Sequence, residues 1–73
     1  MSKTERAKFA FTVKKYYDGK PWIALEPYEG SIERFDNGLL GFDLSEGTDI
    51  NQAKEIANYL NKNLTKLTLT TFD

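Results

Sequence analysis

The sequence predicts a two-layer α+β fold, in which one helix covers one face of a mostly antiparallel sheet of three to five strands. Two observations predict the sheet: apolar and polar residues alternate on both sides of an Asp-Gly turn, and they alternate again over residues 65–72. A third observation predicts the helix, because residues 47–63 combine a capping signal with apolar residues at helical spacing. The expected order is β-β-(β)-β-α-β.

The chain has 73 residues, which is enough for one domain. Residues 1–7 are polar and charged, and we expect them to form a flexible N-terminal tail. Residues 8–73 then form a single α+β domain.

The first two strands are expected at residues 8–16 and 21–28, and the length of the loop between them fixes their register. A two-residue loop would place Phe11 opposite Glu26 and bury a carboxylate. A three-residue loop with a left-handed glycine instead places Phe11 opposite Leu25, so that the apolar faces of the two strands coincide. We therefore predict the three-residue loop.

The later elements follow from capping and alternation. Residues 29–38 are consistent with either a short strand or one helical turn, and residues 39–45 alternate as a strand. Thr48 or Asp49 caps the helix that follows, and a glutamine stands three residues after the aspartate. Residues 65–72 are the last strand.

The predicted core consists of the apolar positions that share one face of these elements. They are Phe9, Phe11, Val13, Ile23, Leu25, Leu40, Phe42, Leu44, Ala53, Ile56, Ala57, Leu60, Leu67 and Leu69. One helix covers only one side of a sheet, so the opposite face is expected to be open. That face carries Thr12, Lys14, Tyr16, Trp22, Ala24, Lys66, Thr68 and Thr70.

The composition argues against catalysis. The chain has no cysteine and no histidine, so it lacks a thiolate nucleophile, the commonest general base and the commonest metal ligand, and no histidine can activate its serines. Its acidic, glycine-containing segment does not have the ligand spacing of a calcium loop. We expect no enzyme activity, no cofactor and no metal.

Charge is distributed unevenly along the chain. Residues 1–20 carry six basic and two acidic residues, a net charge of +4, whereas residues 21–49 carry a net charge of −6. No apolar run is long enough for a signal peptide or a membrane span. A cytoplasmic protein without membrane contact is the expectation.

The open face suggests a function. Tryptophan and tyrosine with lysines beside them are side chains that anchor protein partners. We therefore predict a small non-catalytic protein-binding module, an adaptor or an inhibitor in a bacterial or phage system, which acts by surface occlusion and can self-associate. The predicted binding residues are Lys14, Tyr16, Lys20 and Trp22, with Glu29, Glu33 and Asp36 as an acidic rim.

The alternative is a nucleic-acid-binding sheet, because exposed aromatic rings can stack on bases and lysines can follow phosphates. The net charge of −1 disfavours this alternative. Salt dependence separates the two functions, since phosphate contacts weaken steeply with salt.

The order of the elements resembles that of HicB-like antitoxin domains, in which the helix also follows the third strand. The segment "EGTDINQAKEIAN" is similar to their capped helix, with an alanine on the inward stripe. The turn motif of that family is not present, because "LEPYEGSIE" contains neither its aspartate nor its cysteine. The resemblance implies an antitoxin-type α+β domain and transfers no functional residue.

Overall fold

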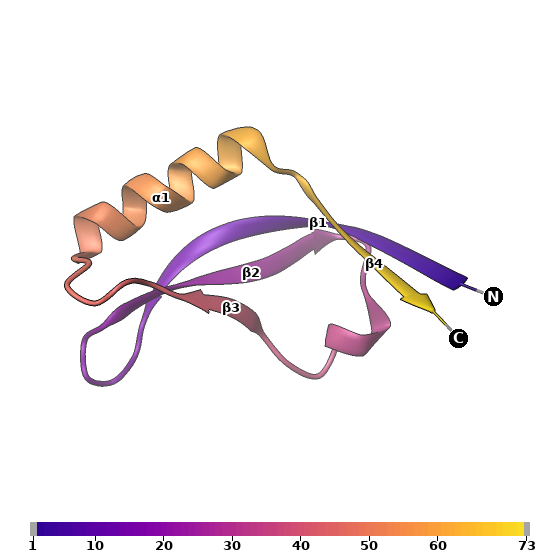
Figure 1. Ribbon diagram of the computed structural model, residues 1–73, viewed down its shortest axis with the longest axis horizontal. Helices are drawn as coiled ribbons and strands as arrows, with labels where there is room; N and C mark the ends of the chain where they lie inside the picture. Colours follow the sequence, from indigo (N-terminus) through magenta and orange to yellow (C-terminus); the bar gives the residue numbers. More distant parts are fainter. Residues whose placement is uncertain (1, 73) are drawn as a thin grey trace.

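A computed structural model describes residues 2–72 and shows a four-stranded antiparallel sheet with one α-helix. Its elements are β1 (Ser2–Lys15), β2 (Pro21–Glu29), the 3-10 helix η1 (Glu33–Phe35), β3 (Leu40–Asp43), α1 (Ile50–Asn63) and β4 (Lys66–Phe72). The helix lies over one side of a curled sheet (Figure 1). The predicted fold class and element order are confirmed.

The β1–β2 hairpin has the predicted register. Phe11 pairs with Leu25 across the two strands, and the N–H of Tyr16 donates to the carbonyl oxygen of Lys20 at 2.9 Å. Gly19 has a φ of 87°, a backbone conformation that glycine adopts without steric cost. The loop of three residues, 17–19, is therefore confirmed.

Strand β1 begins earlier than the sequence indicates. Residues 2–7, expected as a flexible tail, pair instead with β4, from Ser2 opposite Phe72 to Ala7 opposite Leu67. The sheet order is β3-β2-β1-β4, so β4 needs the N-terminal half of β1 as its neighbour. The paired ends extend together beyond the helix, where both termini lie (Figure 1).

Helix α1 begins with a reciprocal capping box. The Asp49 carboxylate accepts from the N–H of Gln52 at 2.8 Å, and the Gln52 side-chain oxygen accepts from the N–H of Asp49 at 2.9 Å. Ala53 and Ala57 are buried and let the helix lie close to the sheet. Within residues 2–72, no helix has both the length and the apolar character needed to cross a membrane.

The segment between β2 and β3 forms a helical turn, η1, rather than a strand. Ile32, which precedes it, is only 1% exposed and packs in a cluster with Ala7, Phe9 and Leu25. The prediction of the core omitted Ile32 and Ala7. A single isoleucine in an irregular segment carries no periodicity that would identify it.

Three residues predicted as core are exposed instead. Leu40 and Phe42 of β3 are 37% and 53% exposed, and Ile56 on α1 is 40% exposed. The reason is the position of the helix, which packs mainly on β1 and β2. Ala24, predicted on the open face, is fully buried among the neighbouring strands.

Candidate protein-binding surface

The predicted aromatic residues form a stack on the face of the sheet opposite the helix. The rings of Tyr16 and Trp22 are 5.4 Å apart between centroids and 15° from parallel. The Tyr16 hydroxyl donates to the Asp43 Oδ1 atom at 2.6 Å, and this bond raises the pKa of Tyr16. The stack therefore ties the hairpin to β3. Asp43 was not among the predicted site residues, although cross-strand pairing with Trp22 places it there.

Trp22 also reaches across to β3. A Cβ atom built on Gly41 would lie 2.3 Å from Trp22 Cζ3 and 2.5 Å from Trp22 Cε3. No real Cβ contact is that short, so the ring rests directly on the backbone of Gly41. Only glycine at this position of β3 leaves room for the ring.

The two predicted lysines beside the stack make different contacts. Lys14 pairs with Glu26 at 3.3 Å, and hydrogen bonds from Thr12 and then Lys14 lower the pKa of Glu26. Lys20 lies in the hairpin loop, where its N–H donates to the Asp18 Oδ1 atom at 3.0 Å. Carboxylates thus lie next to the aromatic rings on this face.

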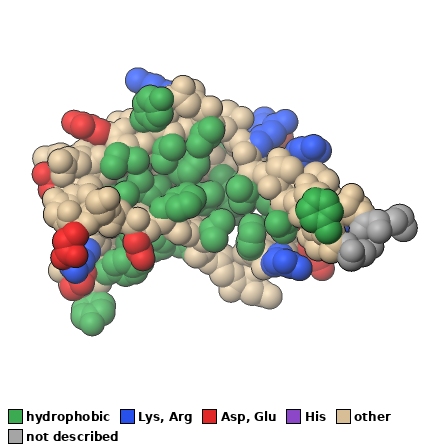
Figure 2. All heavy atoms as spheres, in the orientation of Figure 1, with side chains coloured by type: hydrophobic (Ala, Val, Ile, Leu, Met, Phe, Trp, Pro, Cys, Tyr) green, Lys and Arg blue, Asp and Glu red, His purple; other side chains and the backbone are tan. Residues whose placement is uncertain are grey.

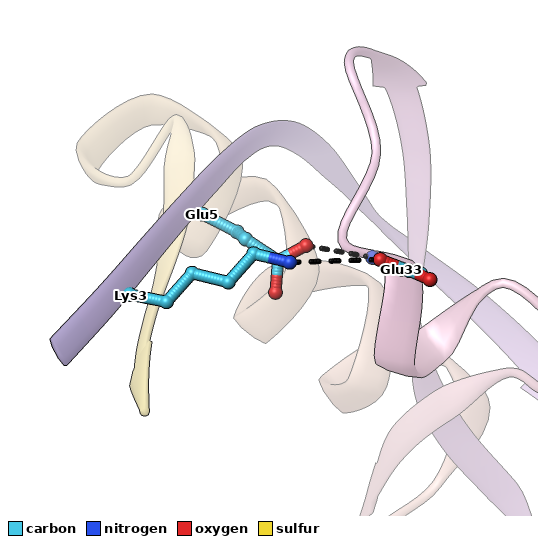
Figure 3. A network of polar contacts seen from close by, with 3 residues as sticks. All are labelled: Lys3, Glu5 and Glu33. Atoms are coloured by element: carbon cyan, nitrogen blue, oxygen red, sulfur yellow. Dashed lines mark hydrogen bonds and ion pairs between the residues drawn. The ribbon is translucent and has the colours of Figure 1, made fainter. Parts of the chain in front are cut away.

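The predicted acidic rim lies elsewhere. Glu29 pairs with Lys8 at 3.1 Å, and Glu33 pairs with Lys3 at 3.6 Å. The N–H of Glu33 also donates to the Glu5 Oε1 atom at 3.1 Å (Figure 3). The hydrogen bond with Glu29, followed by its charge, raises the pKa of Lys8.

The structure therefore separates the predicted set into two groups. Trp22 is paired with Lys14 and Glu29 with Lys8, and six residues of strand span about 20 Å. Asp36 follows η1 and belongs to the second group. The carboxylates of the predicted rim do not surround the aromatic stack.

An apolar groove lies on the helix side of the sheet. It has a volume of about 210 Å³. Its lining includes Phe9, Phe11, Leu25, Phe42, Leu60 and Leu64. Figure 2 shows the hydrophobic side chains gathered in the band between α1 and β3. The sequence pattern identified most of these residues as inward-facing, but it did not indicate that they remain accessible.

A larger and more open hollow of about 830 Å³ lies between the hairpin and the segment that joins β3 to α1. Its charged lining consists of two lysines, Lys15 and Lys20, and four carboxylates, Asp18, Asp43, Glu46 and Asp49. The Asp49 carboxylate already caps the helix. Asp18 and Asp43 likewise accept hydrogen bonds, from the Lys20 N–H and the Tyr16 hydroxyl, so three of the four carboxylates of the hollow are already engaged within the chain.

The edge of β3 is the third feature of this region. The amide side chain of Asn61 bonds to the N–H and the C=O of Phe11, at 2.8 and 2.9 Å, on the side of β1 that faces away from β2. Leu25, the partner of Phe11, therefore directs its backbone groups to β3, where it pairs with Leu40. Backbone groups alternate along a strand, so the N–H and C=O of Leu40 and Phe42 point to β2. The backbone groups of Gly41 and Asp43 point to the free edge of the sheet.

Comparison with known proteins identifies no relative: no family model, no curated protein and no solved structure matches the chain. The resemblance to HicB-like domains therefore stays a prediction from the sequence.

Proposed function

We propose that this chain is a non-catalytic protein-binding module that takes up an extended strand of a partner protein along β3. The observation that carries the proposal is the exposure of Phe42, at 53%, and of Leu40, at 37%, beside an apolar groove. A contiguous apolar patch that the fold itself leaves uncovered is typical of an interaction surface.

A strand is the partner element that suits this surface. Gly41 and Asp43 direct backbone donors and acceptors away from the sheet, and an added strand would pair with them. Its alternate side chains would meet the groove on one face and the Tyr16–Trp22 stack on the other. We expect apolar residues at every second position of the partner strand, facing Phe42.

The proposal keeps part of the set predicted from the sequence. Tyr16 and Trp22 flank the edge of β3 and contribute to the surface, and the exposed Lys20 is close to them in the hairpin. The module would act by occupying the partner's strand, as an adaptor or as an inhibitor. A cytoplasmic location remains a prediction from the sequence, which cell fractionation would check.

Nucleic-acid binding has less support. The aromatic stack has Asp43 in hydrogen-bond contact and Glu26 in an ion pair with the neighbouring Lys14. Two carboxylates at this position would repel phosphates, and the whole chain carries a net charge of −1.

The test is affinity capture from a lysate of the source organism with wild-type protein, Phe42→Ser and Tyr17→Ser. Tyr17 is fully exposed in the hairpin loop, away from the groove, and serves as the matched control. We expect a protein that binds the wild type and Tyr17→Ser but not Phe42→Ser, and whose binding persists after nuclease treatment and in moderate salt. Equal capture by all three proteins would contradict the proposal.

A further inference from the structure

We propose that the strand which pairs with β3 is β3 of a second copy of this chain, so that two molecules form a symmetric dimer with one continuous eight-stranded sheet. This inference rests on the proposed function, because it assigns the partner of the same edge.

The free edge of β3 is ready for pairing with itself. A twofold axis perpendicular to the sheet makes two copies of one strand antiparallel and keeps the same face of each on the same side. The backbone groups of Gly41 and Asp43 already point outward with the alternation that such a ladder needs. The strand contains no lysine and no proline, which are residues that commonly prevent edge-to-edge pairing.

Side-chain pairing selects the register. Residues opposite each other in an antiparallel ladder must point to the same face of the sheet, so the twofold axis passes through a residue position and not between two. The two central residues of β3, Gly41 and Phe42, are the candidates. With Phe42 on the axis, the two Phe42 rings form a closely spaced pair. Leu40 lies opposite Leu44 of the second copy, the residue that follows β3, so pairing extends the strand by one residue beyond Asp43. That arrangement brings six apolar side chains together on the groove side, compared with four in the other register, so we assign it to the dimer.

The opposite face supports the same register. Gly41 would lie opposite Asp43 of the second copy, and the two residues would exchange backbone hydrogen bonds. The Trp22 ring rests on Gly41, so it would lie next to the new strand, which is about 5 Å away. Asp43 is held by the Tyr16 hydroxyl, and its carboxylate therefore stays on this face, away from the apolar pair.

Buried area and charge are compatible with a dimer. A stable interface needs roughly 600–1000 Å² from each partner, which a four-residue edge alone does not provide. The exposed parts of Leu40 and Phe42, the open groove beside them and the Trp22–Tyr16 stack add surface on both faces of the edge. The net charge of −1 per chain gives little repulsion between copies.

The absence of cysteine from the chain allows a direct test by disulfide crosslinking. In the assigned register, residue 40 faces residue 44 of the second copy, whereas within one chain these positions are about 13 Å apart, beyond the reach of a disulfide. The double variant Leu40→Cys/Leu44→Cys keeps Phe42 and is compared with the two single variants under mild oxidation.

We expect the double variant to form a covalent dimer in high yield, and each single variant to remain at least tenfold less crosslinked. Unmodified protein should show twice the monomer mass in sedimentation equilibrium at high concentration, and Phe42→Ser should stay monomeric. Crosslinking of Leu39→Cys/Asp43→Cys, whose positions face each other across the interface only when Gly41 lies on the axis, without crosslinking of Leu40→Cys/Leu44→Cys, would overturn the register.

The outcomes separate this inference from the proposed function. A wild-type protein that is monomeric at all concentrations, with no crosslinking of the double variant, would overturn the inference of a dimer. If Phe42-dependent capture of another protein is still found, the edge of β3 binds a different strand and the proposed function stands. If neither crosslinking nor Phe42-dependent capture occurs, both are wrong.

Discussion

The two edges of the sheet differ in whether their backbone groups have hydrogen-bond partners. On the β1 side, β4 pairs with the first half of the strand, from Ser2 to Lys8. Beyond the first residue of β4, the Asn61 amide bonds to Phe11 as a neighbouring strand would. On the β3 side, the backbone of Gly41 and Asp43 has no such neighbour among the described residues. The chain thus covers one edge by a side chain that imitates a strand and leaves the other open.

The apolar face of the sheet shows the same asymmetry. Near η1 the cluster around Ile32 is closed, with Ile32 1% and Phe9 6% exposed. Near β3 the groove is open, with Phe42 53% exposed. A fold of this size can leave apolar surface uncovered without losing its core, because the closed cluster and the long β1–β2 hairpin supply the stability. The open part is then available for binding.

The largest expected effect compares the closed and the open regions. Ile32→Ala should reduce the free energy of unfolding by about 2–5 kcal/mol, because it leaves a cavity in the closed cluster. Phe42→Ala should cost about 1 kcal/mol or less, since half of that side chain is already in water. Urea unfolding of dilute protein measures both. Equal losses would mean that the groove is closed in solution.

The next comparison concerns the contact between Trp22 and β3. Gly41→Ala should cost about 1–3 kcal/mol, because the new methyl group would overlap the Trp22 ring. Gly38→Ala is the matched control: no atom lies within 4 Å of its added Cβ atom, so the stability should hardly change. Tryptophan fluorescence would follow both variants, and an unaltered Gly41→Ala spectrum would argue against this placement of the ring.

The covered edge gives a smaller effect. Asn61→Ala removes the partner of two backbone groups of Phe11 and should cost about 1–2 kcal/mol. Asn63→Ala on the same helix is the control, since Asn63 only donates from its side chain to the carbonyl of Tyr59 in the last turn. Thermal or urea unfolding would measure the difference. If both variants were equally stable, the Asn61 amide would not be protecting the edge.

The smallest effect is a dependence on pH at the stack. The hydrogen bond to Asp43 raises the pKa of Tyr16 above its ordinary value. The stability that this hydrogen bond contributes is therefore fully present below about pH 10, and it is lost as the pH rises through the higher pKa of the folded protein. Absorbance of tyrosinate would show one late-ionising group that disappears in Tyr16→Phe. In Asp43→Ala the same group should ionise at lower pH; an unchanged titration would exclude the bond.

The sequence predicted those features correctly for which a turn or capping rule and the burial of apolar residues favoured the same structure. The hairpin register followed from the requirement that the two apolar faces coincide, and the helix cap followed from the spacing of Asp49 and Gln52. The same register placed Tyr16 and Trp22 on the face away from the helix. These features depend on residues close in sequence.

Features that depend on distant parts of the chain could not be predicted in this way. Residues 2–7 are polar and form a strand because β4 offers them a partner. The alternation in β3 identifies which side of the strand is apolar, but it does not indicate whether the helix reaches that far. In the region of the candidate site, the sequence indicated the face on which Tyr16 and Trp22 lie, whereas the contacts of Asp43 and Gly41 and the exposure of Phe42 depend on the sheet order.

The most direct test of the open edge is amide hydrogen exchange of the unmodified protein, measured by NMR at low and at high concentration. In dilute protein, the amides of Gly41 and Asp43 should exchange quickly, while those of Phe42 and Phe11 are protected. Raising the concentration should protect Gly41 and Asp43 selectively. Exchange at these two amides that stays fast at every concentration would contradict self-pairing, and protection already present in dilute protein would contradict the open edge itself.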